Sequence, residues 1–140
     1  MSISKASAKW QGGFKDGKGT MKGAHTPDVA FSAGTRFEGV AGSNPEEMVG
    51  AALAGCFSMA LSVGLGQAGL NPTSIESTAD VHLEKVEAGW TVTTIDLVTK
   101  AVVPGATAEQ FQQIAEATKK GCPISRLLAA AKINLTASLA

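Results

Sequence analysis

A long uncharged segment limits what this chain can fold into more than any other feature. From Met48 to Ala68 no side chain carries a charge, which is long enough to suggest a membrane span. Four glycines and two serines dilute the segment, however, and strand-like patterns flank it on both sides, which a single span does not suit. A helix that is apolar all round otherwise belongs in a protein interior. We therefore predict a long buried central helix and no membrane partner.

Start and stop signals place this central helix from Pro45 to about Leu65. Ser43 and Glu46 have the spacing of a capping box, and a proline in the first turn is favourable. Small residues recur at every fourth position, so they lie along one face of the helix, where another helix could approach closely. They are Ala52, Cys56, Ala60 and Gly64.

The remaining elements follow from their hydrophobic periods and turn residues. Strands are predicted over residues 3–11, 18–24, 29–32, 74–86 and 90–103, with a last strand around Ile133–Ala137. Residues 34–44 are predicted as a loop. One helix is expected from Thr107 to about Lys120, where Gly121 would stop it, and a short helix from Cys122 to Ala130. Without a linker or repeat, this order predicts a single α+β domain over residues 1–140, with an antiparallel sheet packed on the central helix.

Burial of that helix also predicts a dimer. A chain of 140 residues has one sheet to cover one side of the helix, and little else to cover the rest. A second copy, with the two central helices packed together, is the simplest remedy.

Composition excludes several classes of function and indicates a compartment. Twelve basic and twelve acidic side chains give a net charge of zero, which argues against a nucleic-acid partner. Two cysteines are too few for a disulfide-stabilised secreted scaffold, and the first ten residues lack the apolar core of a signal peptide. We therefore expect a cytoplasmic protein with reduced cysteines.

The two cysteines are the first candidates for chemistry. Cys56 in an apolar helix is most simply a small core residue, and burial would raise its pKa. Cys122 precedes a predicted helix, whose free N–H groups favour a thiolate, so physical chemistry alone makes Cys122 the more acidic thiol. The two residues could form a disulfide, but a separation of sixty-six positions says nothing about their distance.

Arg36 is the remaining candidate, as one of only two arginines in the chain. It is either an ordinary surface residue or a fixed cation that stabilises a thiolate and orients an oxygen-rich substrate. His25 and His82 are isolated and are expected to face solvent. The sequence contains no cluster of metal ligands and no nucleotide-binding motif.

Several motifs together resemble those of the OsmC/Ohr family, and of its OsmC branch in particular. They are Asn44–Glu47, Ala51–Leu61 around Cys56, Gly121–Ser125 around Cys122, Thr35–Gly39, Pro72–Ile75 and Ala79–Val81. The likeness spans nearly the whole chain. Gly50 and Gly55 depart from it, since alanine is more usual at both positions.

The resemblance implies a thiol-dependent peroxidase that reduces organic hydroperoxides in oxidative or osmotic stress defence. Cys56 would be the peroxidatic residue, and Cys122 would resolve its sulfenic acid to a disulfide. Arg36 and Glu46 match further active-site positions of the family, at which the glutamate would hydrogen-bond to the arginine and orient it. The implied protein is an intertwined homodimer with shared active sites, reset by a dithiol reductant of lipoyl type, and it needs no metal or flavin cofactor. Apolar residues such as Met48, Phe57 and Met59 could favour alkyl hydroperoxides, although each could equally be core packing.

Helix geometry constrains how Glu46 could serve this site. Ten residues of helix span about 15 Å and leave the two side chains about 80° apart, so Glu46 cannot touch Cys56 of its own straight helix. The prediction is that Glu46, with Arg36, reaches Cys56 of the partner subunit. The alternative is that Glu46 only caps its own helix together with Ser43.

Two other functions remain open from the residues. The chain could be a non-enzymatic dimer whose apolar interface holds a hydrophobic ligand, with the cysteines merely buried. It could also be a redox sensor, which would form the disulfide but show negligible turnover.

Overall fold

The computed structural model describes all residues from Met1 to Ala140. It confirms the predicted α+β class, with two three-stranded sheets and one long helix. The chain divides into two compact units, Met1–Glu47 and Met48–Ala140, which we describe separately. The long helix α2 (Pro45–Gln67) begins in the first unit and continues through the second.

The first unit is a small antiparallel sheet followed by a short helix. Strands β1 (Ala6–Gln11), β2 (Lys18–Gly23) and β3 (Val29–Phe31) pair in sequence order. Helix α1 (Ala33–Phe37) occupies part of the segment predicted as a loop. That prediction missed a capping box in which Ser32 and Thr35 each accept a hydrogen bond from the other's backbone N–H. The unit buries almost nothing, since Ala33 is its only buried apolar side chain.

Helix α2 starts where the sequence predicts but uses a different cap. The side chain of Asn44, not Ser43, accepts a hydrogen bond from the backbone N–H of Glu47 at 2.8 Å. The Ser43 hydroxyl is buried without a hydrogen-bond partner. Because Asn44 does the capping, the Glu46 side chain is free for another role.

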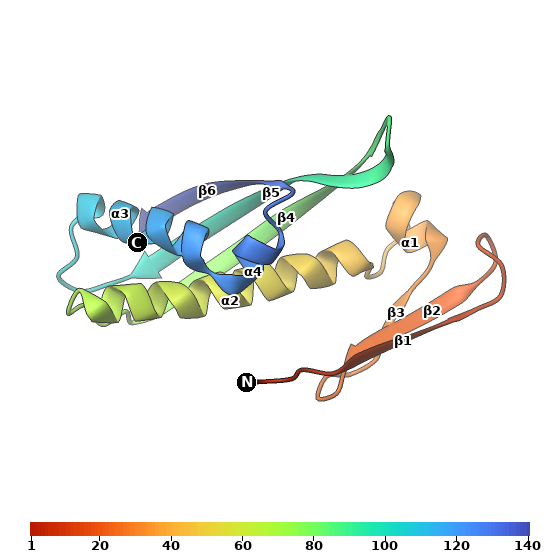
Figure 1. Ribbon diagram of the computed structural model, residues 1–140, viewed down its shortest axis with the longest axis horizontal. Coiled ribbons are helices and arrows are strands. Elements are labelled where there is room, and N and C mark those ends of the chain that lie inside the picture. The colour runs from red at the N-terminus through yellow and green to blue at the C-terminus, as the bar shows by residue number, and fades with distance from the viewer. The chain divides into compact units, whose positions relative to one another are not determined.

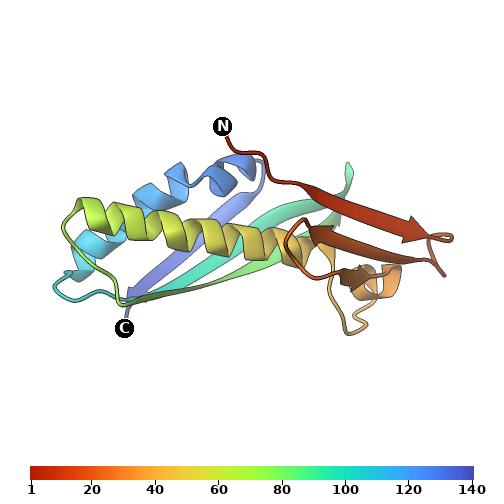
Figure 2. The same cartoon turned by 90° about the horizontal axis from the view of Figure 1, so that it is seen from below.

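The second unit contains a mixed sheet with helices on one face (Figures 1 and 2). Strand β4 (Ser74–Val86) pairs antiparallel with β5 (Gly89–Val102), as predicted. Strand β6 (Lys132–Leu139) pairs parallel with β5, so the expectation of a wholly antiparallel sheet is wrong for this strand. The reason is the long crossover through α3 (Ala108–Gly121) and α4 (Pro123–Leu127), which returns the chain in its original direction.

The core of the second unit lies between the sheet and one face of α2. That face recurs every three or four residues: Gly50, Leu53, Phe57, Leu61 and Leu65. The opposite face is open within the single chain, where Met59 is 73% and Val63 is 56% exposed. By length and composition α2 is apolar enough to cross a membrane, and 28% of its most apolar 18-residue stretch is buried within the chain. We predicted that α2 would be buried on all sides, but within the single chain only one side of it is buried.

The stripe of small residues on α2 does receive another helix, as predicted. At Gly64 an added Cβ would lie 2.9 Å from Cγ2 of Ile114 in α3, so glycine allows this close approach without displacing the Ile114 side chain. The contact is with a helix of the same chain.

The junction between α3 and α4 ends α3 differently from the prediction. Thr107 caps α3 as expected, accepting a hydrogen bond from the N–H of Gln110. Gly121, predicted as the stop, remains helical and has no positive φ. Proline instead ends the helix, because Pro123 forces Cys122 into an extended conformation with φ −57° and ψ 128°. Helix α4 then ends at Leu127, three residues earlier than predicted.

Candidate active site

The fold brings the two cysteines into contact. Cys56 lies in the middle of α2 and Cys122 lies between α3 and α4, yet their sulfur atoms are 2.7 Å apart. Both are free thiols. A disulfide bond is about 2.05 Å long, so a small movement would join them. The proximity that the sequence could not establish is thus a property of the folded second unit.

Local structure explains why Cys122 points at α2. The Cys122 N–H donates to the Thr118 carbonyl at 2.9 Å, and its own carbonyl accepts from the Arg126 N–H at 3.0 Å. These bonds tie Cys122 to the end of α3 and the start of α4. Its side chain is only 1% exposed, whereas Cys56 is partly exposed. A molecule arriving from solvent therefore meets Cys56 first.

The two thiols differ in acidity. Burial raises the pKa of Cys56, and the adjacent Cys122 raises it further. Burial also opposes ionisation of Cys122, but the Cys56 thiol, the N–H and hydroxyl of Ser125 and the N–H of Ile124 outweigh it and lower the pKa of Cys122. The Ser125 hydroxyl makes no hydrogen bond of ordinary geometry, so it acts as a nearby dipole. Within the single chain, Cys122 is the more acidic thiol.

Arg36 and Glu46 form an ion pair within the first unit. Nε of Arg36 lies 3.1 Å from both carboxylate oxygens of Glu46, and Nη2 lies 2.5 Å from Oε1. The Arg36 side chain is 35% exposed and that of Glu46 is 12% exposed. The alternative in which Glu46 merely caps α2 with Ser43 is therefore wrong. Glu46 instead fixes the guanidinium group in one plane, as bidentate carboxylate pairing does.

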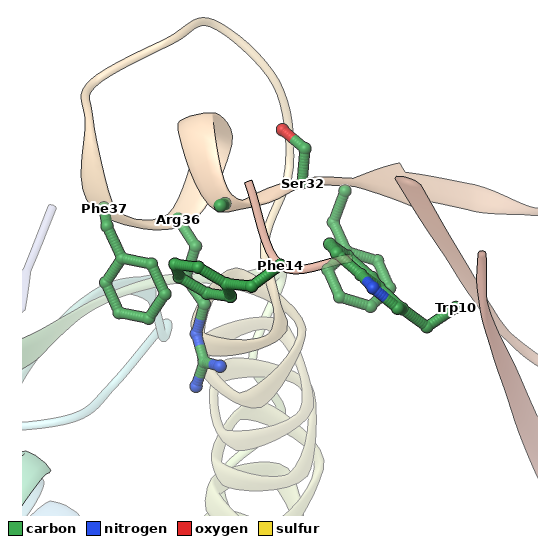
Figure 3. Close-up of a pocket in the computed structure, with 7 residues that line it drawn as sticks. Trp10, Phe14, Ser32, Arg36 and Phe37 are labelled. Atoms are coloured by element: carbon green, nitrogen blue, oxygen red, sulfur yellow. The ribbon is translucent and has the colours of Figure 1, made fainter. Parts of the chain in front are cut away.

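An aromatic cavity beside Arg36 was not predicted from the sequence. It has a volume of about 180 Å³ and lies within the first unit (Figure 3). Its lining comprises Trp10, Phe14, Phe31, Ser32, Ala33, Arg36 and Phe37. The available signal was two large aromatic residues, Trp10 and Phe14, in a segment otherwise rich in lysine and glycine.

Other sequence candidates lie elsewhere. Phe57 is fully buried in the core and Met59 is exposed on the open face of α2. His82 faces solvent, as predicted, and its Nε2 lies 2.8 Å from Oδ2 of Asp96. No group of three or more His, Cys, Asp or Glu side chains could hold a metal ion.

Comparison with known proteins identifies the family. Residues 37–138 match the family model described as OsmC-like protein. The chain is 49% identical over 128 residues to Peroxiredoxin OsmC of Escherichia coli K12, covering 90% of each chain. It is equally similar to Peroxiredoxin OsmC of Shigella flexneri.

Solved structures agree on the fold. An OsmC-like protein of unknown function from Vibrio cholerae is similar with a TM-score of 0.79 at 20% identity, covering 98% of this chain and 99% of its own. The organic hydroperoxide resistance protein OhrB of Bacillus subtilis is similar with a TM-score of 0.71 at 22% identity, covering 97% and 98%. Helix α2 is thus a core helix of a known fold rather than a membrane span. The chain belongs to the OsmC family.

Proposed function

We propose that this protein is a thiol-dependent peroxidase that reduces organic hydroperoxides, with Cys56 as the attacking thiol and Cys122 as the resolving thiol. The observation that carries the proposal is the sulfur–sulfur distance of 2.7 Å between two free cysteines. The relatives named Peroxiredoxin OsmC, at 49% identity, support it.

The proposed cycle has three balanced steps. The Cys56 thiolate attacks the terminal oxygen of ROOH, the O–O bond breaks, and the alkoxide takes a proton to leave as ROH. Cys56 is then a sulfenic acid. The Cys122 thiolate attacks that sulfur, a disulfide forms, and hydroxide leaves with a proton as water. A dithiol finally exchanges with the disulfide, which restores two thiols and oxidises the reductant to its own disulfide.

The accessibility of the two thiols supports this division of roles, whereas the acidity of Cys56 needs a further contribution. Cys122 is almost fully buried, so the substrate can reach only Cys56. The lowered pKa of Cys122 suits a resolving thiol, which reacts as a thiolate. Cys56, whose pKa is raised, requires a cation beside it to become a thiolate. We assign that role to Arg36, held in position by Glu46.

The proposed assembly is a homodimer with shared sites, in which residues 1–140 form one domain. Two observations support it: the open apolar face of α2, and a first unit with almost no core of its own. Because Glu46 and Cys56 lie on one continuous helix, they point apart by about 80°. The pair Arg36–Glu46 would therefore act on Cys56 of the partner subunit.

The proposed location and reductant follow from the need to return both cysteines to thiols. A cytoplasmic location would keep both cysteines reduced between cycles, and a lipoyl-type dithiol would act as reductant. The weak O–O bond supplies the driving force, so the three steps above involve no metal or flavin.

Stopped-flow mixing of the reduced protein with an organic hydroperoxide tests the function, with mass spectrometry of the product. A peroxidase will form an internal Cys56–Cys122 disulfide and turn over when a dithiol is present. A hydrophobic-ligand-binding protein would show no oxidation at catalytic rates. A redox sensor would form the disulfide without sustained turnover.

Mixed dimers test the shared site. Heterodimers of a Cys56→Ser protomer with a Glu46→Ala protomer are compared with both parent homodimers. If the site is shared, one site carries both defects and the other is intact, so activity rises well above either parent. If each chain builds its own site, both sites remain defective and activity stays at the level of the parents.

A further inference from the structure

One buried hydroxyl group near the thiols has no hydrogen-bond partner in the reduced protein. Ser125 lies in α4 and is only 4% exposed, yet its Oγ forms no hydrogen bond. Burying a hydroxyl group without a partner costs stability, so such a group calls for an explanation, and a role in redox chemistry is one. Ser125 follows Cys122, the proposed resolving thiol, by three positions, and the α3–α4 junction lies against the middle of α2 (Figure 1).

The usual partner of a side chain in this position is already occupied. Cys122 is the N-cap of α4, and Ser125 is the third residue of that helix. In a capping box, the side chain of the third residue bonds to the backbone N–H of the N-cap residue. Here that N–H donates instead to the carbonyl of Thr118, at 2.9 Å, because α3 ends at the same cysteine. The Ser125 hydroxyl therefore lacks the partner that a capping box would give it.

The same geometry leaves the sulfur of Cys122 as the group that this hydroxyl can serve. The first turn of a helix brings the side chain of its third residue back to the N-cap residue. Both side chains are buried, since Cys122 is 1% exposed. A thiolate accepts hydrogen bonds far more strongly than a neutral thiol does. In agreement, the Ser125 hydroxyl lowers the pKa of Cys122, which means that it favours the ionised sulfur.

We propose that the Ser125 hydroxyl donates a hydrogen bond to the sulfur of Cys122 whenever that sulfur is a thiolate, and that it thereby assists two steps of the cycle. In the resolving step, the Cys122 thiolate attacks the Cys56 sulfenic acid, the S–S bond forms and hydroxide leaves. In the reductive step, a thiolate of the dithiol attacks the more exposed sulfur, that of Cys56, and Cys122 leaves as a thiolate that then takes a proton. The second thiol of the reductant releases Cys56 from the mixed disulfide. The inference rests on the proposed peroxidase function, to which it adds a residue.

Titration of Cys122 alone tests the hydrogen bond without any peroxide. In the Cys56→Ser variant Cys122 is the only cysteine, and the ultraviolet absorbance of its thiolate is followed against pH. Adding Ser125→Ala should raise the pKa of Cys122, whereas Ser125→Thr, which keeps a hydroxyl group, should leave it lower than Ser125→Ala does. Helix α2 has no charge beyond Glu47, and the charged side chains at the ends of α3 and α4 stay in place in every variant: Lys119, Lys120 and Arg126. An unchanged pKa in Ser125→Ala overturns the proposal.

The rates of the separate steps test the role of Ser125 in the cycle. In Ser125→Ala with both cysteines present, stopped-flow mixing with cumene hydroperoxide should oxidise Cys56 at the wild-type rate. Disulfide formation, followed by acid quenching and mass spectrometry, should be about three- to tenfold slower. One hydrogen bond to a charged group changes the thiolate population by about tenfold, and the greater nucleophilicity of a less acidic thiol restores about threefold of that. Disulfide formation at the wild-type rate, or an equal slowing of both steps, overturns the proposal.

Stability distinguishes this role from a structural one. Because the Ser125 hydroxyl has no hydrogen bond in the reduced protein, Ser125→Ala should unfold at the same denaturant concentration as the wild type or at a higher one. Ser43→Ala is the matched control, since Ser43 carries the other buried hydroxyl group without a partner. A clear loss of stability in Ser125→Ala but not in Ser43→Ala would reveal a structural bond and overturn the proposal. A raised pKa of Cys122 in a protein that does not consume peroxides would overturn only the peroxidase function.

Discussion

The two units of this chain differ in how many apolar side chains they bury. The second unit, Met48–Ala140, holds twelve of the thirteen buried apolar residues and encloses its own core. The first unit, Met1–Glu47, holds one, and strand β1 is exposed along its whole length. The second unit carries the thiols and the first carries the Arg36–Glu46 pair.

The difference teaches how the two halves of the proposed site are held. The thiols are positioned by hydrophobic packing and, at Cys122, by backbone hydrogen bonds to Thr118 and Arg126. The cation is positioned by an ion pair and by aromatic stacking on an otherwise exposed unit. We therefore expect changes to the thiols of the second unit to decide whether chemistry occurs, and changes to the cation of the first unit to decide how fast it occurs.

The largest effect is expected from the accessible thiol of the second unit. Cys56→Ser should reduce peroxide turnover by about a thousandfold or more, because a serine hydroxyl stays protonated and is a poor nucleophile. Consumption of cumene hydroperoxide with a dithiol donor measures it. Turnover at the wild-type rate would show that Cys56 is not the attacking residue.

The buried thiol should fail differently. Cys122→Ser should allow one oxidation of Cys56 per chain and then stop, because no thiol remains to condense with the sulfenic acid. Mass spectrometry should find Cys56 as sulfenic, sulfinic or sulfonic acid and no internal disulfide. Sustained peroxide turnover by the Cys122→Ser variant would contradict the role of Cys122 as the resolving thiol.

Removing the cation of the first unit should slow the reaction without abolishing it. Arg36→Ala is expected to lower the rate of Cys56 oxidation by about ten- to a hundredfold, the cost of one strong charged hydrogen bond. Arg36→Lys should recover little, because an ammonium group lacks the planar fork with which a guanidinium bonds to two oxygen atoms in fixed geometry. Stopped-flow traces measure the rate, and circular dichroism checks that the fold is unchanged. Wild-type rates in both variants would make Arg36 an ordinary surface residue.

The open face of α2 can be tested at a glycine. A Cβ atom added at Gly55 meets nothing within 4 Å in the single chain, and Gly55 is exposed there, so we expect a monomer to tolerate Gly55→Arg. If a second copy covers this face, the same change places a buried charge in the interface and shifts the protein to monomers. Sedimentation measures the mass, with Ala117→Arg on the exposed surface of α3 as the control. A dimer that survives Gly55→Arg must use another face.

The smallest effect concerns a polar cluster on the sheet of the second unit. Hydrogen bonds from Asn134 and His82 lower the pKa of Asp96, whose side chain is 44% exposed. A lowered folded pKa adds stability above the unfolded value of about 3.9, and this stability is lost as pH falls through the folded pKa. Asp96→Asn should therefore flatten the acid limb of the stability curve slightly below about pH 4. Chemical denaturation across this pH range measures it, and an acid limb identical to that of the wild type would contradict the prediction.

The sequence by itself determined much of this protein. The uncharged run predicted α2, the alternating patterns predicted β4 and β5, and the motifs around Cys56 and Cys122 predicted the family. These features are local, because periodicity, capping and motif spacing act within a few turns of chain. The same reasoning placed the cap of α2 at Ser43, because Ser43 and its neighbour Asn44 are both good capping residues; Asn44 is the cap. It also missed α1, because a helix of five residues with its own capping box resembles a loop in the sequence.

Only the tertiary structure decided the contacts that carry chemistry. The parallel pairing of β6 depends on a crossover through two helices, and the contact of Cys56 with Cys122 spans sixty-six positions. The gathering of the rings of Trp10, Phe14, Phe31 and Phe37 from two strands, a turn and helix α1 likewise follows from the path of the chain. Each of these contacts joins groups from different elements of the chain. The distance between such groups depends on how whole helices and strands pack, and the local composition of the sequence does not reveal it.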